Sequence, residues 1–308
     1  GTPLLIDIEK DFYPNYLRLV IRANQPLAST PTVKFDNGKK IFRAECIPQQ
    51  PHRYIASVPL AEIAGDSVHL EVAAEGLFGQ AETWQDWFVN ALVQPGRGRS
   101  LFAPDGRMRV AFSEESVYWP WYGRVKIDTL TRIRDSRVIG PIYRVEPQDV
   151  ALDDGAVVTL IYPDTVSQPQ QLGVCYLYRN EWVFIENKIN AANHTVSARV
   201  FSMEDFAIIR DDEPPVLNIR APLAGSVTRN RRPLISVGAN DTTSGFESEE
   251  SIELRLDDQK LIAEYDPERD VVQYRPKRDL LPGVHKLTAR AEDRCRNVAW
   301  REVEFTVR

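Results

Sequence analysis

Long apolar runs and cysteine pairs are scarce in this sequence of 308 residues. No apolar run approaches the ~18 residues that a membrane-spanning helix requires, so we expect no insertion into a membrane. The three cysteines, Cys46, Cys175 and Cys295, lie far apart in the sequence, and one of them must stay unpaired. Three cysteines are too few for a disulfide-stapled scaffold, which excludes the class of small disulfide-rich proteins.

An excess of positive charge is also missing. The chain has 38 Lys and Arg against 44 Asp and Glu, which gives a net charge of −6 at pH 7. This balance excludes the electrostatic attraction that nucleic-acid-binding proteins rely on, and we expect no nucleic-acid partner. The chain starts at Gly1 rather than Met. We interpret this start as processing of, or excision from, a longer protein.

Catalytic spacings are missing as well. No two of the four histidines, His52, His69, His194 and His285, have the i, i+2 or i, i+4 spacing that turns two imidazoles toward one zinc ion. The sequence has no G-x-S-x-G elbow, no phosphate-binding glycine loop and no CxxC pair. We therefore predict that the chain is not an enzyme and has no catalytic residues. The less favoured alternative is a carbohydrate-processing enzyme, because the two carboxylates of a glycosidase need not be close in sequence.

Alternation with a period of two dominates the sequence. Apolar residues alternate at Leu17–Ile21, Met108–Phe112, Ile252–Leu256 and Val303–Val307, as half-buried strands require. The 21 prolines are spread through the chain, and no stretch longer than about ten residues keeps a helical period. The pattern predicts an all-β protein of tandem β-sandwiches.

Short local signals add detail to this prediction. One-turn helices are expected only near Pro59–Ala64 and Arg278–Leu281. The pairs Asn37-Gly38, Asp105-Gly106 and Asp154-Gly155 are typical of turns that need a positive φ.

Two polar segments predict the domain boundaries. Gln94–Arg99 has no apolar residue and two glycines, and Asp211–Pro215 combines acidic residues, which we expect to be solvated, with a double proline. The chain is therefore predicted to contain three sandwiches, at residues 1–94, 95–211 and 212–308. We expect separate sheets on the two sides of residues 95–99.

The first and third segments look like copies of one fold. Leu19–Asn24 matches Ile235–Asn240, and Phe88 matches Phe305. Gly65 and His69 match Gly283 and His285, which predicts a shared structural role for the two histidines. The offset between the copies changes only at expected loops, which favours one duplicated fold around a different middle sandwich.

The third segment resembles the bacterial immunoglobulin-like modules of exported proteins. The residues that carry the resemblance are Pro214-Pro215, Asp241, Ser244-Gly245, Asp257-Asp258, Tyr274, Pro276, Leu281-Pro282-Gly283, His285, Ala291, Asp293 and Asn297. The resemblance implies an extracytoplasmic location, in the periplasm or at the cell surface.

The middle segment resembles the β-sandwich of ankyrins and netrin receptors. The residues that carry this resemblance are Asp105-Gly106, Pro141–Pro147, Val157–Pro163, Tyr176–Tyr178, Trp182 and Phe206–Ile209. The order of the sandwiches is similar to regions that trail lysostaphin-type peptidases and to other surface proteins. This similarity implies a non-catalytic spacer or adhesion module. The alternative is an accessory region that targets a cell-wall hydrolase encoded outside this chain.

An aromatic cluster is the first candidate binding site. Tyr118, Trp119, Trp121 and Tyr122 flank Pro120, so four aromatic rings fall within five residues. Aromatic faces stack on sugar rings or anchor protein partners. Strand alternation cannot turn all four rings inward, although packing in the core and at a domain junction is the alternative. A cell-surface glycan or a protein is the expected partner.

An acidic loop is the second candidate. Asp241 follows one strand and Asp293 lies in the last hairpin, and these loops leave an immunoglobulin-like sandwich at the same end. With Glu247 nearby, these carboxylates are candidate calcium ligands, since calcium takes six to eight oxygens. Capping of turns by these acids is the alternative. The first segment has Gln25 and Gly76 at the corresponding places, and we expect no calcium there.

Overall fold

The fold is all-β. The computed structural model describes residues 2–129, 135–148 and 150–308, and there the only helices are four short 3₁₀ turns. These are η1 (Leu60–Ile63), η2 (Pro169–Gln171), η3 (Ala191–Asn193) and η4 (Glu249–Ser251). The turn expected near Pro59–Ala64 is confirmed, whereas residues 278–281 form no helix. None of the described helices has the length and apolar character needed to cross a membrane.

The described chain falls into two compact units. One contains the described parts of residues 1–131, 141–159 and 199–206, and the other contains those of residues 132–140, 160–198 and 207–308. The middle segment therefore contributes strands to both units. The boundaries at residues 94/95 and 211/212 stay a prediction.

The first segment folds as two facing sheets. One sheet has the order β1 (Ile6–Phe12), β2 (Tyr16–Ala23), β6 (Arg53–Pro59), β5 (Cys46–Gln50). The facing strands have the order β8 (Ala81–Val93), β7 (Gly65–Glu75), β3 (Thr32–Asp36), β4 (Ile41–Ala44). Leu17, Leu19 and Ile21 of β2 are fully buried against Phe35 and Leu70, which confirms the inward face predicted from the alternation.

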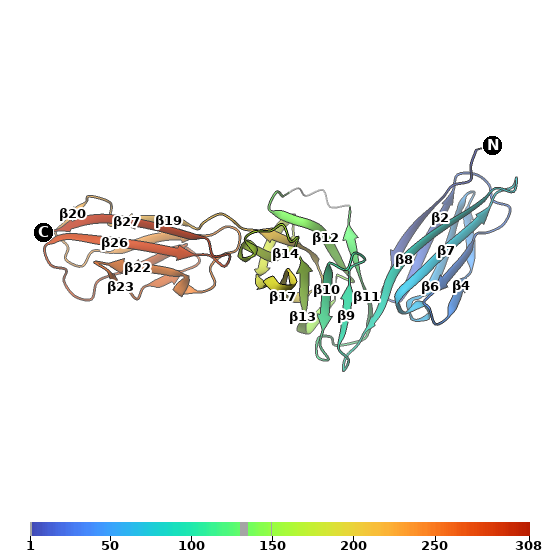
Figure 1. Ribbon diagram of the computed structural model, residues 1–308, viewed down its shortest axis with the longest axis horizontal. Helices are drawn as coiled ribbons and strands as arrows, with labels where there is room; N and C mark the ends of the chain where they lie inside the picture. The colour runs from blue at the N-terminus through green and yellow to red at the C-terminus, as the bar shows by residue number, and fades with distance from the viewer. Residues whose placement is uncertain (1, 130–134, 149) are drawn as a thin grey trace. The chain divides into compact units, whose positions relative to one another are not determined.

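Strand β8 also pairs with the middle segment. Trp121, Tyr122 and Gly123 of β11 (Trp121–Asp128) lie opposite Val93, Leu92 and Ala91 in antiparallel register. The two strands are neighbours in one nine-stranded sheet (Figure 1). The expectation of separate sheets on the two sides of residues 95–99 is therefore wrong. The polar linker residues end strand β8. The backbone N–H and C=O groups along the edge of β8 can still pair with another strand, and β11 is that strand.

The middle segment supplies the remaining strands of two sheets. Beyond β11, the nine-stranded sheet continues with β12 (Val138–Glu146), β18 (Asp205–Arg210), β14 (Leu172–Tyr178) and β15 (Glu181–Glu186). The other sheet has the order β16 (Lys188–Asn190), β17 (Thr195–Ser202), β13 (Ala151–Ile161), β10 (Met108–Phe112), β9 (Arg99–Phe102).

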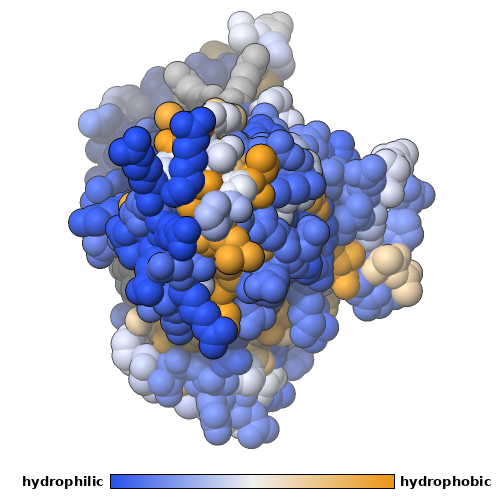
Figure 2. Space-filling view, turned by 90° about the vertical axis from the view of Figure 1, so that its left-hand side faces the viewer, coloured by the Kyte–Doolittle hydropathy of each residue, from blue (hydrophilic) through white to orange (hydrophobic). Residues whose placement is uncertain are grey.

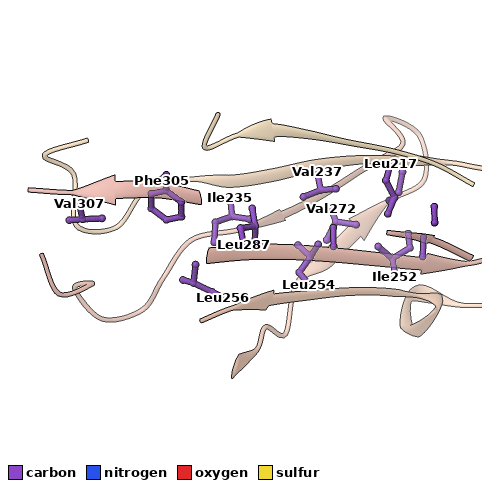
Figure 3. Packing of buried hydrophobic residues seen from close by; sticks show 14 residues of the cluster. Leu217, Ile235, Val237, Ile252, Leu254, Leu256, Val272, Leu287, Phe305 and Val307 are labelled. Atoms are coloured by element: carbon purple, nitrogen blue, oxygen red, sulfur yellow. The ribbon is translucent and has the colours of Figure 1, made fainter. Parts of the chain in front are cut away.

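The third segment is a sandwich with its own core. One sheet has the order β19 (Val216–Ala221), β21 (Ile235–Asn240), β25 (Val271–Tyr274), β24 (Glu264–Asp266). The other sheet has the order β20 (Val227–Thr228), β27 (Val298–Val307), β26 (Gly283–Glu292), β22 (Ile252–Leu256), β23 (Gln259–Lys260). Leu254, Leu287 and Phe305 are buried in the core (Figure 3). Viewed from the C-terminal side, the surface is mainly hydrophilic, with apolar residues in small groups (Figure 2).

The first and third segments share their strand order. Strands β1, β2, β6 and β5 correspond to β19, β21, β25 and β24, and β8, β7, β3 and β4 correspond to β27, β26, β22 and β23. The copies differ beside their last strand: β27 pairs with β20 of its own segment, in parallel, whereas β8 pairs with β11. The strand order is what a duplicated fold requires.

The match between His69 and His285 is wrong by one residue. Val68 pairs with Phe88, and His285 pairs with Phe305, so the buried position of His285 corresponds to Val68. A bulge between Gly65 and Val68 adds one residue to β7 and turns His69 to the other face. There the His69 ring lies 4.4 Å from the ring centroid of Trp87, which is exposed.

Two of the three predicted turns are confirmed. Gly38 and Gly106 have φ of 78° and 69° and lie outside strands. Gly155 also has a positive φ, 73°, but it lies inside β13. A Cβ there would approach the carbonyl oxygen of Val200 to 2.7 Å, so Gly155 permits a close approach between strands instead of a chain reversal.

Candidate functional site

The aromatic cluster divides between the surface and the core. Tyr118 and Trp119 precede β11 and are each 55% exposed, with their rings stacked at 5.8 Å. Trp121 begins β11, is 6% exposed and meets the ring of Phe112 edge-on at 5.4 Å. Tyr122 is half-buried and packs against the core of the first segment. Pro120 separates the exposed pair from the packed pair, so only Tyr118 and Trp119 present open ring faces.

Trp119 lies on a groove of about 840 Å³. One wall is the end of β1 and the turn that follows it, at residues 9–15, together with Arg18 of β2. The other wall contains residues 119–122, Arg124 and Lys126 of β11, and the end of β12. Strand β11 pairs with β8, which is a strand of the first segment. This second wall therefore lies beside the first segment.

Arg124 connects the two walls. Its side chain is 4% exposed, and its guanidinium carbon lies 3.6 Å from the ring centroid of Phe12, in a cation–π contact. Its Nη1 donates to Glu146 at 2.8 Å. Its Nε has no hydrogen-bond partner within the described part of the chain. The arginine is therefore held by one carboxylate and one aromatic face.

Lys126 shares the partners of Arg124. Its Nζ lies 4.7 Å from the ring centroid of Phe12 and 3.1 Å from Glu146. Burial lowers the pKa of Lys126, and Arg124 lowers it further, although Glu146 acts in the opposite direction. Burial opposes ionisation of Glu146, but Lys126 and Arg124 outweigh it and hold the pKa of Glu146 below its ordinary value.

Lys10 and Arg144 add two more cations to the groove. Burial lowers the pKa of Lys10 to about 8, and the nearby charge of Lys126 contributes to the shift. Lys10 also pairs with Asp86. Arg144 binds both carboxylate oxygens of Asp205, each at 2.8 Å, in the bidentate arrangement that fixes a guanidinium in one orientation.

The acidic residues of the third segment form a separate cluster. One carboxylate oxygen from each of Asp211, Asp241 and Asp293 lies within 4.8 Å of the others. Asp211 follows β18, Asp241 follows β21 and Asp293 follows β26. Asp211 is 2% exposed and Asp293 is 4% exposed. Three carboxylates therefore come together at one end of this sandwich, and two of them belong to residues that are almost fully buried.

Loop donors hold these carboxylates in place. Asp241 accepts from the backbone N–H of Gly245 at 2.6 Å, and Asp211 accepts from that of Ser244 at 3.0 Å. Asp293 accepts from Asn297 through both the backbone and the side chain, at 2.9 and 2.8 Å. These bonds fit the capping alternative, and they also orient the three carboxylates toward one point.

The electrostatics of the cluster disfavour three ionised carboxylates. Burial raises the pKa of Asp293 to about 6, although hydrogen bonds from Asn297 act in the opposite direction. Asp211 and Asp241 raise it further, because each places a like charge nearby. Burial also raises the pKa of Asp211. A proton or a cation would relieve this repulsion.

The predicted ligand set agrees with this cluster only in part. Asp241 and Asp293 come together as expected, but Glu247 is exposed and does not belong to the group. Asp211 takes its place, although the sequence predicted it to be part of a solvated linker. The signal that could have pointed to it is its position directly after β18, where a side chain can still turn inward.

His285 has the structural role that its surroundings predicted. Its Nδ1 lies 2.6 Å from Asp257, and its Nε2 lies 2.7 Å from the carbonyl oxygen of Leu281. Burial lowers the pKa of His285, but the bonds to Asp257 and Leu281 raise it more, so the net shift is upward. The histidine therefore ties the start of β26 to the β22–β23 turn.

Comparisons with known proteins show similarity only at the level of structure. No family model matches, and no curated protein matches. A structure concerning host cell surface retention of a 1.5-MDa bacterial ice-binding adhesin has 11% identity and a TM-score of 0.23 and covers 100% of this chain and 99% of that one. A tetra-tandem repeat from the extending region of a large adhesion protein has 10% identity and a TM-score of 0.25, with coverage of 99% and 74%.

A glycan-binding protein is also among the structural matches. The Bacteroides ovatus protein SGBP-B of the mixed-linkage glucan utilization locus, in complex with a heptasaccharide, has 13% identity and a TM-score of 0.20. The match covers 98% of this chain and 70% of that one. These TM-scores are too low to carry an argument about function.

Proposed function

We propose that this chain is a non-catalytic segment of a bacterial exported or surface protein that binds a glycan in the groove beside Trp119. The observation that carries the proposal is the exposed indole of Trp119, which borders a groove lined mainly by polar and charged side chains. Aromatic side chains that line a groove are frequent anchors for ligands.

The chemistry of the groove suits a saccharide. A sugar ring offers an apolar face, which stacks on an indole, and a rim of hydroxyls, which exchange hydrogen bonds with charged side chains. Arg144 and Glu146 of β12 supply donors and acceptors on the same groove, and both are held by ion pairs. Preorganised polar groups lose little entropy on binding.

The β-sandwiches of the first and third segments fit a spacing role. They are built from strands with one buried face, and such domains in series hold a binding surface away from an anchor. An extracytoplasmic location belongs to this proposal and rests on the resemblance to modules of exported proteins. The alternative, a region that targets a cell-wall hydrolase, stays a prediction.

Replacement of Trp119 tests glycan binding. We expect Trp119→Ala to lose about tenfold or more in affinity for the ligand found on a glycan array, because an aromatic anchor carries much of the binding energy. Trp300→Ala is the matched control, since Trp300 is 53% exposed on β27 of the third segment. Equal affinity of both variants, measured by calorimetry, would contradict the proposal, as would the absence of any bound glycan.

We also propose calcium binding at Asp211, Asp241 and Asp293. The three converging carboxylates are oxygen ligands of the kind that calcium takes. The ion would offset the repulsion that raises the pKa of Asp293. The role of the ion would be to stiffen the end of the third sandwich, which is a stability function.

Thermal unfolding with calcium and with chelator tests this second proposal. We expect millimolar calcium to raise the unfolding temperature of the chain and of Glu247→Gln, but not that of Asp241→Asn. Glu247 is the matched control because it is an acid of the same loop outside the cluster. An unchanged midpoint in the unaltered chain would contradict calcium binding, as would an equal rise in Asp241→Asn.

A further inference from the structure

We propose that Lys10 and Asp86 condense to an amide, so that a covalent bond between their side chains cross-links the two sheets of the first sandwich. Lys10 belongs to β1 of one sheet, and Asp86 belongs to β8 of the facing sheet. The chain makes this modification in itself, and the bond is separate from the binding of a ligand in the groove.

Asp86 occupies a position that the fold gives to an apolar side chain. It lies on β8 between Trp84 and Phe88, and both of these pack against the core of the first sandwich. Phe88 corresponds to Phe305 of the third segment. Two residues before Phe305, that copy has Val303, which packs against its own core. The duplicated fold therefore needs no acid at this position, and the role of Asp86 lies in its contact with another side chain.

The side chain that Asp86 contacts is that of Lys10. Lys10 lies between Ile8 and Phe12, which pack against the same core from β1. Its Nζ is in contact with Oδ2 of Asp86. The two side chains are 23% and 31% exposed, so much of their surface is out of contact with water. The contact joins the first strand of this sandwich to its last strand.

The surroundings of the pair favour its neutral form. The ring centroids of Trp84 and Phe88 lie 5.8 and 5.7 Å from Nζ of Lys10. Burial lowers the pKa of Lys10 to about 8, and the charge of Lys126 contributes to the shift. Apolar surroundings penalise an ammonium and a carboxylate, and transfer of one proton between them leaves an amine and a carboxylic acid. An uncharged lysine amine in such surroundings is a nucleophile.

The hydrogen bonding of Asp86 suits an attack on its carboxyl carbon. Its Oδ1 accepts from the backbone N–H of Trp87 at 2.8 Å. This N–H stabilises the negative charge that develops on Oδ1 during the attack, as a donor of an oxyanion hole does. Oδ2, which contacts Lys10, is the oxygen that leaves. Because the fold holds the two groups together, the effective molarity of the amine can reach about 10⁵ M.

The condensation balances without any other reactant. The ammonium of Lys10 gives one proton to Oδ2 of Asp86, and the resulting amine attacks Cγ and forms the Nζ–Cγ bond. A second proton moves from the nitrogen to Oδ2, the Cγ–Oδ2 bond breaks, and one water molecule departs. The third hydrogen stays on the nitrogen as the amide N–H. One positive and one negative charge disappear together, so the net charge of the chain is unchanged.

The cross-link suits a segment that serves as a spacer. It closes a loop from residue 10 to residue 86, and a closed loop reduces the conformational freedom of the unfolded chain. The two sheets of the first sandwich also cannot separate fully while the bond is intact. The amide therefore strengthens this sandwich in a way that an ion pair, which water can replace, does not.

The mass of the intact, denatured full chain tests the proposal. We expect this mass to be lower than the sequence mass by one water molecule. Lys10→Arg keeps a cation beside Asp86 but has no amine that can be deprotonated, so it should have its full sequence mass. Lys34→Arg is the matched control and should still lack one water. Lys34 pairs with Glu71 at 2.9 Å in the same sandwich, and the exposures of these side chains are similar, 28% and 27%.

Tryptic peptides locate the bond. Trypsin does not cleave after an acylated lysine, so the digest should contain residues 1–18 joined to residues 54–97. The full sequence mass in the unaltered chain would overturn the proposal, as would a loss of water that persists in Lys10→Arg. A loss of water within a single peptide would also overturn it, because an aspartate before a glycine, such as Asp105 or Asp154, can cyclise onto its own backbone.

Discussion

Arg124 is the residue whose removal should affect the groove most. It is buried, it pairs with Glu146, and it lies on the ring of Phe12. Glu146 keeps Lys126 as its partner in the variant, so the loss is that of one charged hydrogen bond and of the contact with the ring of Phe12. We expect Arg124→Met to lower the free energy of unfolding by about 2 kcal/mol, as measured by urea unfolding.

An exposed ion pair provides the control for Arg124. Arg22 pairs with Glu9 on the surface of the first sandwich, and we expect Arg22→Met to cause a much smaller loss than Arg124→Met. Similar losses in the two variants would show that the contacts of Arg124 with Glu146 and Phe12 add no specific stability.

Asp293 should make the third sandwich less stable as the pH rises. Its folded pKa, about 6, is above the ordinary value of 3.8, so between these values the native state binds more protons than the unfolded state. The contribution of Asp293 to the free energy of unfolding is therefore complete below pH 3.8. It is lost progressively as the pH rises to about 6 and does not change further above that pH. Asp211 and Asp241 face Asp293 and strengthen the effect.

Hydrogen exchange in the presence of chelator measures this dependence. We expect the opening free energy of amides in β21 and β26 to fall as the pH rises through this window, and Asp293→Asn to flatten the change. A slope of the opposite sign, or one that Asp293→Asn leaves unaltered, would contradict the assignment. Calcium should offset the loss above pH 6 if the ion binds at the cluster.

At the scale of the elements, Gly155 shows a constraint that comes from a neighbouring strand. An alanine there would have to adopt a positive φ and would place its Cβ 2.7 Å from the carbonyl oxygen of Val200. Gly79 also has a positive φ, but it has open space around it. We expect Gly79→Ala to cost about 1 kcal/mol from backbone strain alone and Gly155→Ala to cost distinctly more. Chemical unfolding measures both, and equal costs would show that β13 and β17 can move apart.

The bulge in β7 is the reason that the predicted match between His69 and His285 is wrong by one residue. In sequence, Gly65 and His69 resemble Gly283 and His285, and nothing in the local pattern marks an extra residue. The bulge becomes evident only from the pairing of Gly65 with Asn90 and of Val68 with Phe88. Because side chains alternate with a period of two, one inserted residue moves His69 from the core face to the outer face.

At the scale of the whole molecule, the first and third sandwiches should differ in whether each forms a stable monomer when it is isolated. Residues 212–308 keep both of their sheets, with β20 beside β27. Residues 1–94 lose β11 and expose the edge of β8. We expect the third segment alone to be a stable monomer and the first segment alone to self-associate, because an unpaired edge strand is a template for pairing.

Size-exclusion chromatography of the two isolated segments checks this prediction, and extension of the first segment to residue 211 is the control. The extension includes β11 together with its second partner β12 and the other strands of the middle segment, and it should restore a monomer. A first segment that is monomeric on its own, and as stable as the extended form, would show that the pairing of β8 with β11 is dispensable.

Local alternation was sufficient to determine from the sequence that this chain is an all-β protein with its apolar faces at Leu17–Ile21, Met108–Phe112 and Ile252–Leu256, because a period of two requires only near neighbours. Only the tertiary structure decided the contents of the sites. Phe12, Arg124 and Glu146 meet because β11 pairs with both β8 and β12, and Asp211 joins Asp241 and Asp293 because three strands end at one place. Sheet order and bulges depend on contacts between residues that are far apart in the sequence, and a local sequence pattern does not indicate such contacts.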